Sequence, residues 1–85
     1  MFFLYILKSL KDQKLYAGST ARLKDRLKEH NLGLVTSTKN RRPLKLIYCE
    51  GYSVEEDARR REHNLKLRAK ALKQLKSRIS NSLNS

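Results

Sequence analysis

Five side chains of this 85-residue chain have types that could work together in an active site. They are Tyr5, Tyr16, Arg26, His30 and Glu62. Arg26 and His30 are four positions apart, so on a helix they project from one face. The set offers phenols, an imidazole that titrates near neutral pH, a guanidinium whose planar fork matches phosphate oxygens, and a carboxylate suited to a hard cation. These types are suited to acid–base chemistry and to binding an anion.

A polar, basic stretch adds hydroxyls and cations that suit a phosphate backbone. Its candidate nucleic-acid contacts are Thr36, Ser37, Thr38, Lys39, Arg41 and Arg42. The whole chain carries 20 Lys and Arg against 8 Asp and Glu, a net charge of +12. Such a charge favours binding to a polyanion, most often nucleic acid. An acidic protein or membrane surface would suit the same composition. Composition therefore supports binding and says nothing about catalysis.

Each of these residues also has an ordinary structural interpretation. Aromatic residues favour strands, so the two tyrosines could simply pack in the core. Arg26 and His30 could form a solvated helix face, and Glu62 could form a salt bridge with the arginines at 59–61. The joint occurrence of the five types in a strongly basic chain is what favours a functional site.

The elements that must position these residues follow from the apolar pattern. Strands are predicted at residues 2–8, 15–18 and 44–50, and helices at 21–30, 54–69 and 70–78. Alternation along the first strand puts Phe3, Tyr5 and Leu7 on one face of the sheet. Glu62 falls on the apolar stripe of the second helix, between Ala58 and Leu65.

Local signals mark the ends of these elements. Ser19 or Thr20 is predicted to cap the first helix, and Ser53 with Glu56 forms a capping box before the second. Gly51 is expected to end the third strand. The order β-β-α-β-α-α predicts an α+β (mixed α/β) fold, a three-stranded antiparallel sheet flanked by helices. Residues 1–80 would form one domain, followed by a frayed tail at 81–85.

Several protein classes are excluded by the sequence. The longest apolar run, residues 1–7, is too short to span a bilayer, which needs about 20 residues. The single cysteine, Cys49, excludes a disulfide framework and a four-cysteine zinc site. We therefore expect a cytoplasmic protein without a membrane partner, with Cys49 buried as a small hydrophobe.

The ordered set of motifs resembles the GIY-YIG nuclease superfamily. Tyr5, within Leu4-Tyr5-Ile6, and Tyr16-Ala17-Gly18 are similar to its paired signature, and residues 23–31 resemble its Arg-x-x-x-His helix. Residues 56–62 resemble the helix that supplies a metal-binding glutamate. The resemblance covers residues 2–75 and is greatest to small stand-alone members related to the nuclease domain of UvrC. The chain departs from the pattern at Phe3 and Ala17, and at Gln74, which stands where many members carry asparagine.

The resemblance implies a metal-dependent DNA endonuclease that hydrolyses phosphodiester bonds, with a role in DNA repair or recombination. It implies Mg²⁺ or Mn²⁺ at Glu62, with Arg26 stabilising the transition state and His30 orienting or relaying a proton. We favour Tyr16 as the general base and Tyr5 as its partner or as a group that orients phosphate. Sequence selectivity would be weak or supplied by a protein partner.

Two other functions fit the sequence. A non-catalytic nucleic-acid-binding module would keep the scaffold and its charge but would have no cleavage to lose when Glu62 or Arg26 is replaced. A basic adaptor could instead dock on an acidic protein or on ribosomal RNA. Affinity that barely changes with salt would count against any phosphate-led function.

Overall fold

The computed structural model describes residues 1–84, and its element order confirms the predicted α+β fold. The elements are β1 (Phe2–Ser9), β2 (Leu15–Thr20), α1 (Leu23–Asn31), the 3₁₀ turn η1 (Lys39–Arg41), β3 (Leu44–Tyr52), α2 (Glu55–Leu67), α3 (Ala69–Arg78) and α4 (Ser80–Leu83). The strands form one antiparallel sheet in the order β2-β1-β3. β1 is therefore the central strand, and β2 and β3 are both edges.

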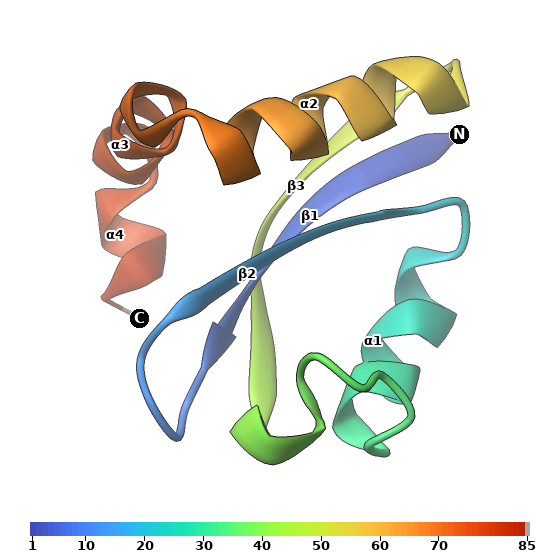
Figure 1. The fold of residues 1–85 in the computed structure, drawn as a ribbon, viewed down its shortest axis with the longest axis vertical. Coiled ribbons are helices and arrows are strands. Elements are labelled where there is room, and N and C mark those ends of the chain that lie inside the picture. Colours follow the sequence, from blue (N-terminus) through green and yellow to red (C-terminus); the bar gives the residue numbers. More distant parts are fainter. Residues whose placement is uncertain (85) are drawn as a thin grey trace.

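Helices cover both faces of this sheet (Figure 1). On one face Leu4 and Ile6 of β1 pack against Leu65 of α2 and Leu75 of α3. On the other face a second cluster forms around Tyr5 and Leu7, and leucines of α1 pack against it. The predicted alternation of β1 is thus confirmed, because each set of alternate side chains meets a different helix layer. Tyr5 faces α1, while the helix that carries Glu62 lies across the sheet.

The start of α1 differs from the prediction. β2 stays paired with β1 up to Thr20, opposite Phe3, so Ser19 and Thr20 have strand geometry and α1 begins only at Leu23. No side chain caps this helix; the Thr20 hydroxyl instead accepts a hydrogen bond of 3.0 Å from the Arg22 N–H. Pairing between strands has overridden the local capping preference of these residues.

The junction between β3 and α2 differs for the same reason. Phe2 and Phe3 of β1 pair with Tyr52 and Gly51, so β3 continues through the glycine that was expected to end it. The predicted capping box is wrong, since α2 begins at Glu55 with no side-chain cap. Cys49 is exposed rather than buried, at a position on an edge strand.

The C-terminal residues are more ordered than the predicted frayed tail. Residues 81–83 belong to α4, and the Lys8 ammonium donates a hydrogen bond of 2.6 Å to the Leu83 carbonyl. Ser85, the last residue of that predicted tail, lies outside the described residues. Across residues 1–84, no helix combines the length and the apolar character needed to cross a bilayer.

Candidate active site

A chain of buried hydrogen bonds joins β1, α1 and the loop after α1. The hydroxyl of Tyr5 lies 2.9 Å from Nε2 of His30, and Nδ1 of His30 lies 2.7 Å from the hydroxyl oxygen of Thr38. The Thr38 hydroxyl is placed to donate to the Val35 carbonyl at 3.5 Å. We therefore assign the His30 proton to Nδ1, which leaves Nε2 to accept from Tyr5. All three side chains are buried.

The environment of His30 favours its neutral form. Burial lowers the pKa of His30, and the positive charge of Arg26 lowers it further, against a smaller opposing effect of Glu29. A neutral imidazole can accept a proton at Nε2, whereas an imidazolium could not. His30 can therefore hold the Tyr5 hydroxyl or take its proton.

Both tyrosine rings meet the imidazole edge-on. The ring centroid of His30 lies 5.7 Å from that of Tyr5 and 5.2 Å from that of Tyr16. Burial is the main reason that the pKa of Tyr5 is raised; Arg26 acts against this rise, while Tyr16 and Glu62 add to it. Tyr16 is half-buried on the edge strand β2. The two predicted phenols thus lie on one face of the sheet, with Tyr16 the more accessible.

Gly18 makes room for the Tyr5 ring. The two residues are paired across the β1–β2 ladder, and a Cβ on Gly18 would overlap the hydroxyl and Cζ of Tyr5. A side chain at this position would therefore push the ring away from His30. The glycine of the Tyr16-Ala17-Gly18 signature is a steric requirement of the phenol that lies over it.

Arg26 lies one helical turn before His30 on α1. Its guanidinium forms an ion pair of 3.0 Å with Glu29 and also interacts with the Tyr5 hydroxyl; these contacts raise the pKa of Arg26. About 37% of its side chain is exposed, so a substrate can reach it. The charge of Arg26 acts on the pKa of both Tyr5 and His30, so this partly exposed cation belongs to the same site.

Glu62 approaches the same place from α2, past the edge strand β2. Its Oε1 accepts a hydrogen bond of 2.6 Å from the Ser19 hydroxyl, and its Oε2 lies 2.7 Å from the ammonium of Lys66. That ammonium also lies 5.3 Å from the centre of the Tyr16 ring. The carboxylate therefore converges with the tyrosines, although α1 and α2 lie on opposite faces of the sheet.

The ordinary interpretation of Glu62 as a partner of the neighbouring arginines does not hold. Arg59 pairs with Glu55, Arg60 with Glu56 and Asp57, and Arg61 with Glu50. Glu50 is itself held by hydroxyls of Tyr48 and Tyr52. Glu62 pairs with Lys66 instead, which leaves it facing β2.

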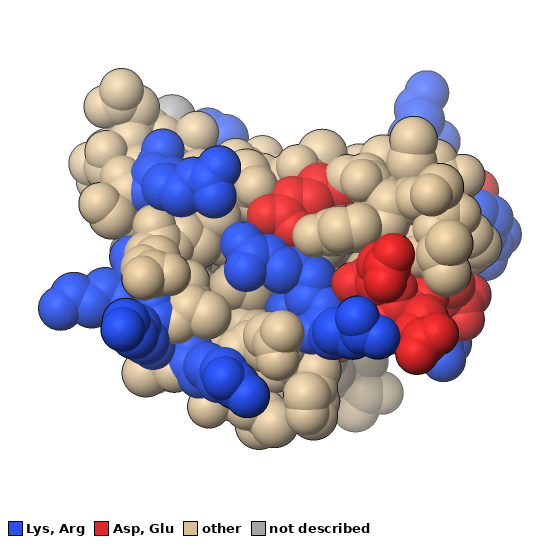
Figure 2. Space-filling view, turned by 90° about the horizontal axis from the view of Figure 1, so that it is seen from above, with Lys and Arg blue, Asp and Glu red and all other residues tan. Residues whose placement is uncertain are grey.

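Figure 2 shows the surface above α2 and α3, where Lys and Arg spread over the left and centre of the view.

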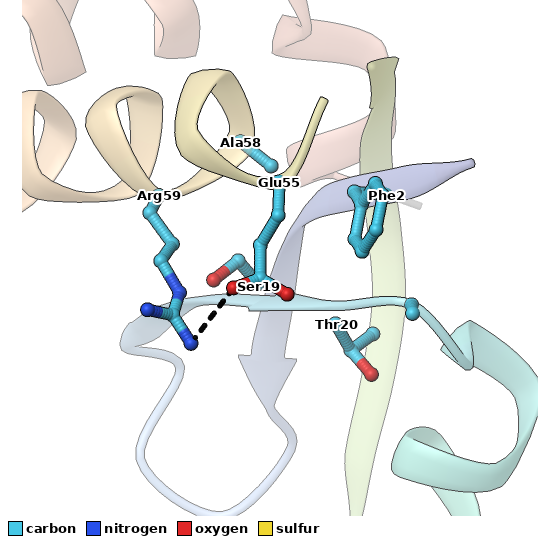
Figure 3. A pocket seen from close by; sticks show the side chains of 7 residues that line it. Phe2, Ser19, Thr20, Glu55, Ala58 and Arg59 are labelled. Carbon is cyan, nitrogen blue, oxygen red and sulfur yellow. Dashed lines mark ion pairs between the residues drawn. The ribbon is translucent and has the colours of Figure 1, made fainter. Parts of the chain in front are cut away.

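A small pocket lies beside Ser19 and Thr20 at the end of β2 (Figure 3). Its volume is about 130 Å³, and Phe2, Ser19, Thr20 and the first turns of α2 line it. The ion pair of 3.1 Å between Arg59 and Glu55 lies at its α2 side. Because Ser19 both lines this pocket and donates to Glu62, one side chain separates the pocket from the carboxylate.

Glu62 is suited to a hard divalent cation such as Mg²⁺. Within the described part of the chain, no three or more His, Cys, Asp and Glu residues group together as a metal cage would require. Mg²⁺ is commonly held by one or two carboxylates together with water and substrate phosphate. A single carboxylate that already attracts the Lys66 ammonium matches that pattern, whereas it would not hold zinc.

The basic loop divides into inward and outward residues. Thr38 is buried against His30, so its side chain has no surface to offer nucleic acid, contrary to our expectation. Arg41 is held by Asp12 at 3.0 Å. The remaining candidates, Thr36, Ser37, Lys39 and Arg42, are exposed. A loop sequence alone cannot tell which of its polar side chains faces a buried partner.

Sequence reasoning missed two residues of the site. Lys66 is four positions after Glu62, so its helical spacing could have revealed it. Ser19 carries no such signal, because its sequence context predicts a helix cap. Gln74, at the position of the family's asparagine, lies on α3, where it lines a pocket with Arg61 and Arg78.

Comparison with known proteins gives consistent matches. A family model described as the GIY-YIG catalytic domain matches residues 1–78, a span that contains all five candidate residues. The UPF0213 protein SH2523 of Staphylococcus haemolyticus is 39% identical over 79 residues, 89% of this chain and 95% of that protein. The UPF0213 protein YazA of Bacillus subtilis is 39% identical over 74 residues, 86% of this chain and 74% of that protein.

One solved structure resembles the fold. The solution NMR structure of the UPF0213 protein BH0048 from Bacillus halodurans matches with a TM-score of 0.56 and 32% sequence identity. The match covers 91% of this chain and 84% of that one. The arrangement of strands and helices described above is therefore shared with a relative.

Proposed function

Because the chain belongs to the GIY-YIG catalytic domain family, a family of nucleases, we propose that it is a metal-dependent endonuclease that hydrolyses phosphodiester bonds of DNA. We extend this proposal to a role in DNA repair or recombination. The observation that supports it is that several candidate side chains act on the phenol of Tyr5. Tyr5 contacts His30 directly, and the charges of Arg26 and Glu62 both act on its pKa.

In this proposal Arg26 stabilises the transition state. Phosphodiester hydrolysis adds negative charge to the phosphate oxygens, and a guanidinium offers two parallel N–H donors to them. The partial exposure of Arg26 supports this role, since the side chain can exchange Glu29 for a phosphate. It keeps its positive charge throughout the neutral pH range.

Tyr16 is proposed as the general base and Tyr5 as its partner. A phenol loses its proton near neutral pH only with the help of a nearby cation. The Lys66 ammonium lies 5.3 Å from the centre of the Tyr16 ring, and the half-buried position of Tyr16 lets water reach it. The raised pKa of Tyr5 and its bond to neutral His30 suit a hydroxyl that stays protonated and orients phosphate.

Glu62 would hold Mg²⁺ or Mn²⁺, and Ser19 would keep its carboxylate oriented. When bound, such a cation supplies Lewis-acid stabilisation of charge on the phosphate and leaving oxygens. Lys66 would have to release Oε2 of Glu62 for this ligand to be fully available.

The exposed loop residues would hold the DNA backbone. Thr36, Ser37, Lys39 and Arg42 carry hydroxyls and cations that contact phosphates and carry little sequence information. We therefore propose weak sequence selectivity, or selectivity supplied by a protein partner. We also place the enzyme in the cytoplasm, where an exposed free thiol such as Cys49 stays reduced.

Cleavage of supercoiled plasmid in Mg²⁺ or Mn²⁺, with a chelator as control, tests the proposal. Glu62→Gln and Arg26→Ala should each lower cleavage by about 100-fold or more, as removal of one transition-state contact does. Glu56→Gln is the matched control, because it removes an exposed carboxylate from the same helix. Wild-type protein that cleaves nothing in either metal, or cleavage that survives Glu62→Gln, would overturn it.

One observation favours a second function. The Lys66 ammonium lies 2.7 Å from Oε2 of Glu62, so the carboxylate is already neutralised in this structure. A non-catalytic nucleic-acid-binding module would tolerate that pairing permanently. Its signature would be DNA affinity that falls steeply with salt, together with an absence of metal-dependent cleavage.

A further inference from the structure

A cationic cleft lies where the β1–β2 turn meets η1, outside the group of candidate catalytic residues. Its volume is about 390 Å³, and its lining consists of Lys11, Asn31, Lys39, Asn40, Arg42 and Pro43. Three of these side chains are cations and two are amides, and no carboxylate lines the cleft. We propose that it binds a phosphate of the nucleic-acid backbone other than the one that reacts.

Two of the cations are anchored to the same short piece of backbone. The Lys11 ammonium donates to the Asn40 carbonyl at 3.1 Å, and Nε of Arg42 donates to the Lys39 carbonyl at 2.8 Å. The terminal nitrogens of Arg42 lie against Gly33, whose φ is +79° and whose missing Cβ leaves room for them. Anchored cations lose less freedom when a ligand binds, which favours affinity.

The acid beside Lys11 in the sequence does not cancel the charge of the cleft. Asp12 follows Lys11, but its carboxylate accepts hydrogen bonds from the Lys14 N–H and from Arg41, which lower its pKa to about 2. Arg41 is thus used to neutralise Asp12. Within residues 1–84, none of Lys11, Lys39 and Arg42 forms an ion pair with a carboxylate, so an anion from outside is the partner that fits.

Two residues of the cleft are chain neighbours of candidate active-site residues. Asn31 follows His30, and Lys39 follows Thr38, and a hydrogen bond of 2.7 Å joins His30 to Thr38. The amide of Asn31 also holds both backbone groups of Leu44, at 2.8 and 3.0 Å. These hydrogen bonds fix the side chain of Asn31 at the cleft. The proposal rests on the proposed function, because it presupposes a nucleic-acid substrate.

Binding of a fluorescent DNA duplex, measured across a range of salt concentrations, tests the assignment. All variants are made in the Glu62→Gln background, so that cleavage does not enter. Lys11→Gln and Arg42→Gln should each reduce the slope of log affinity against log salt by about 0.9, and the double variant by about twice that. Lys73→Gln, an exposed cation on α3, is the matched control and should leave the slope unchanged.

Folding of each variant is checked by circular dichroism, because Lys11 and Arg42 also hold η1. Inorganic phosphate titrated into labelled protein gives a second readout, with amide shifts expected at residues 11 and 39–42. Equal slopes for the cleft variants and the control, with no phosphate shifts in those residues, would overturn the cleft. If the cleft variants reduce the slope of log affinity against log salt but the wild-type protein never cleaves DNA, the cleft assignment is supported and the nuclease proposal is contradicted.

Discussion

The hydroxyl of Tyr5 lies 2.9 Å from Nε2 of His30, although the two residues are 25 positions apart. This contact ties the central strand to α1 and continues through His30 to Thr38 in the following loop. Because His30 is neutral and both its nitrogens are occupied, it is a fixed support for the tyrosines rather than a freely titrating surface group.

The two tyrosines should respond differently to loss of the hydroxyl. Tyr16→Phe should abolish cleavage while leaving stability nearly unchanged, because its hydroxyl forms no hydrogen bond with another group among residues 1–84 and its ring is kept. Tyr5→Phe should lower stability by about 1–3 kcal/mol, since Nε2 of His30 is left without its partner. Plasmid cleavage and urea unfolding measure the two effects. Intact cleavage in Tyr16→Phe with none in Tyr5→Phe would reverse their roles.

Stability should fall as the pH drops below about 6.5. The fold lowers the pKa of His30, so the unfolded chain takes up a proton near pH 6.5 before the folded protein does. Stability is then fully present above pH 6.5 and declines toward the lower folded pKa, by at most about 1.4 kcal/mol per pH unit. Urea midpoints between pH 7.5 and 5 measure this. His30→Gln should show a flatter profile, and parallel profiles for the two proteins would contradict the assignment.

Replacing Lys66 should change metal binding and cleavage in opposite directions. Lys66→Met frees Oε2 of Glu62 and should tighten Mn²⁺ binding by about two- to fivefold, the equivalent of one partly exposed ion pair. It also removes the cation over Tyr16, so cleavage should slow. Mn²⁺ titration followed by electron paramagnetic resonance measures affinity directly. Lys70→Met, an exposed lysine on α3, is the control, and equal affinities in the two variants would exclude competition at Glu62.

Gly18 should tolerate no side chain. Gly18→Ala would place a Cβ on the hydroxyl and Cζ of Tyr5 and should cost about 1–3 kcal/mol of unfolding free energy. Gly51→Ala is the matched control in β3, because its Cβ would meet the flexible Met1 side chain at 3.3 Å, which can move. Urea unfolding of both variants provides the comparison. A loss in Gly51→Ala as large as that in Gly18→Ala would show that the Tyr5 ring is not the cause.

Much of the architecture could be predicted because it follows from the local pattern of apolar residues along the chain. The alternation along β1 sends Leu4 and Ile6 to one helix layer and Tyr5 and Leu7 to the other, and the structure confirms this. The ends of elements were predicted less well. Ser19, Thr20 and Gly51 have strong local preferences, but each has a pairing partner on β1 that extends its strand.

The chemical types of the site, their order along the chain and the strongly positive charge are properties of the sequence itself, since composition and spacing need no partner. Which polar groups meet was decided only by the tertiary structure. Thr38 is buried because its hydroxyl forms a hydrogen bond with Nδ1 of His30, and Arg41 forms an ion pair with Asp12. Glu62 accepts a hydrogen bond from Ser19, 43 positions away, and does not pair with the arginines beside it. Hydrogen bonds and ion pairs join side chains from distant segments, so the packing of helices on both faces of the sheet selects among partners that the sequence offers equally.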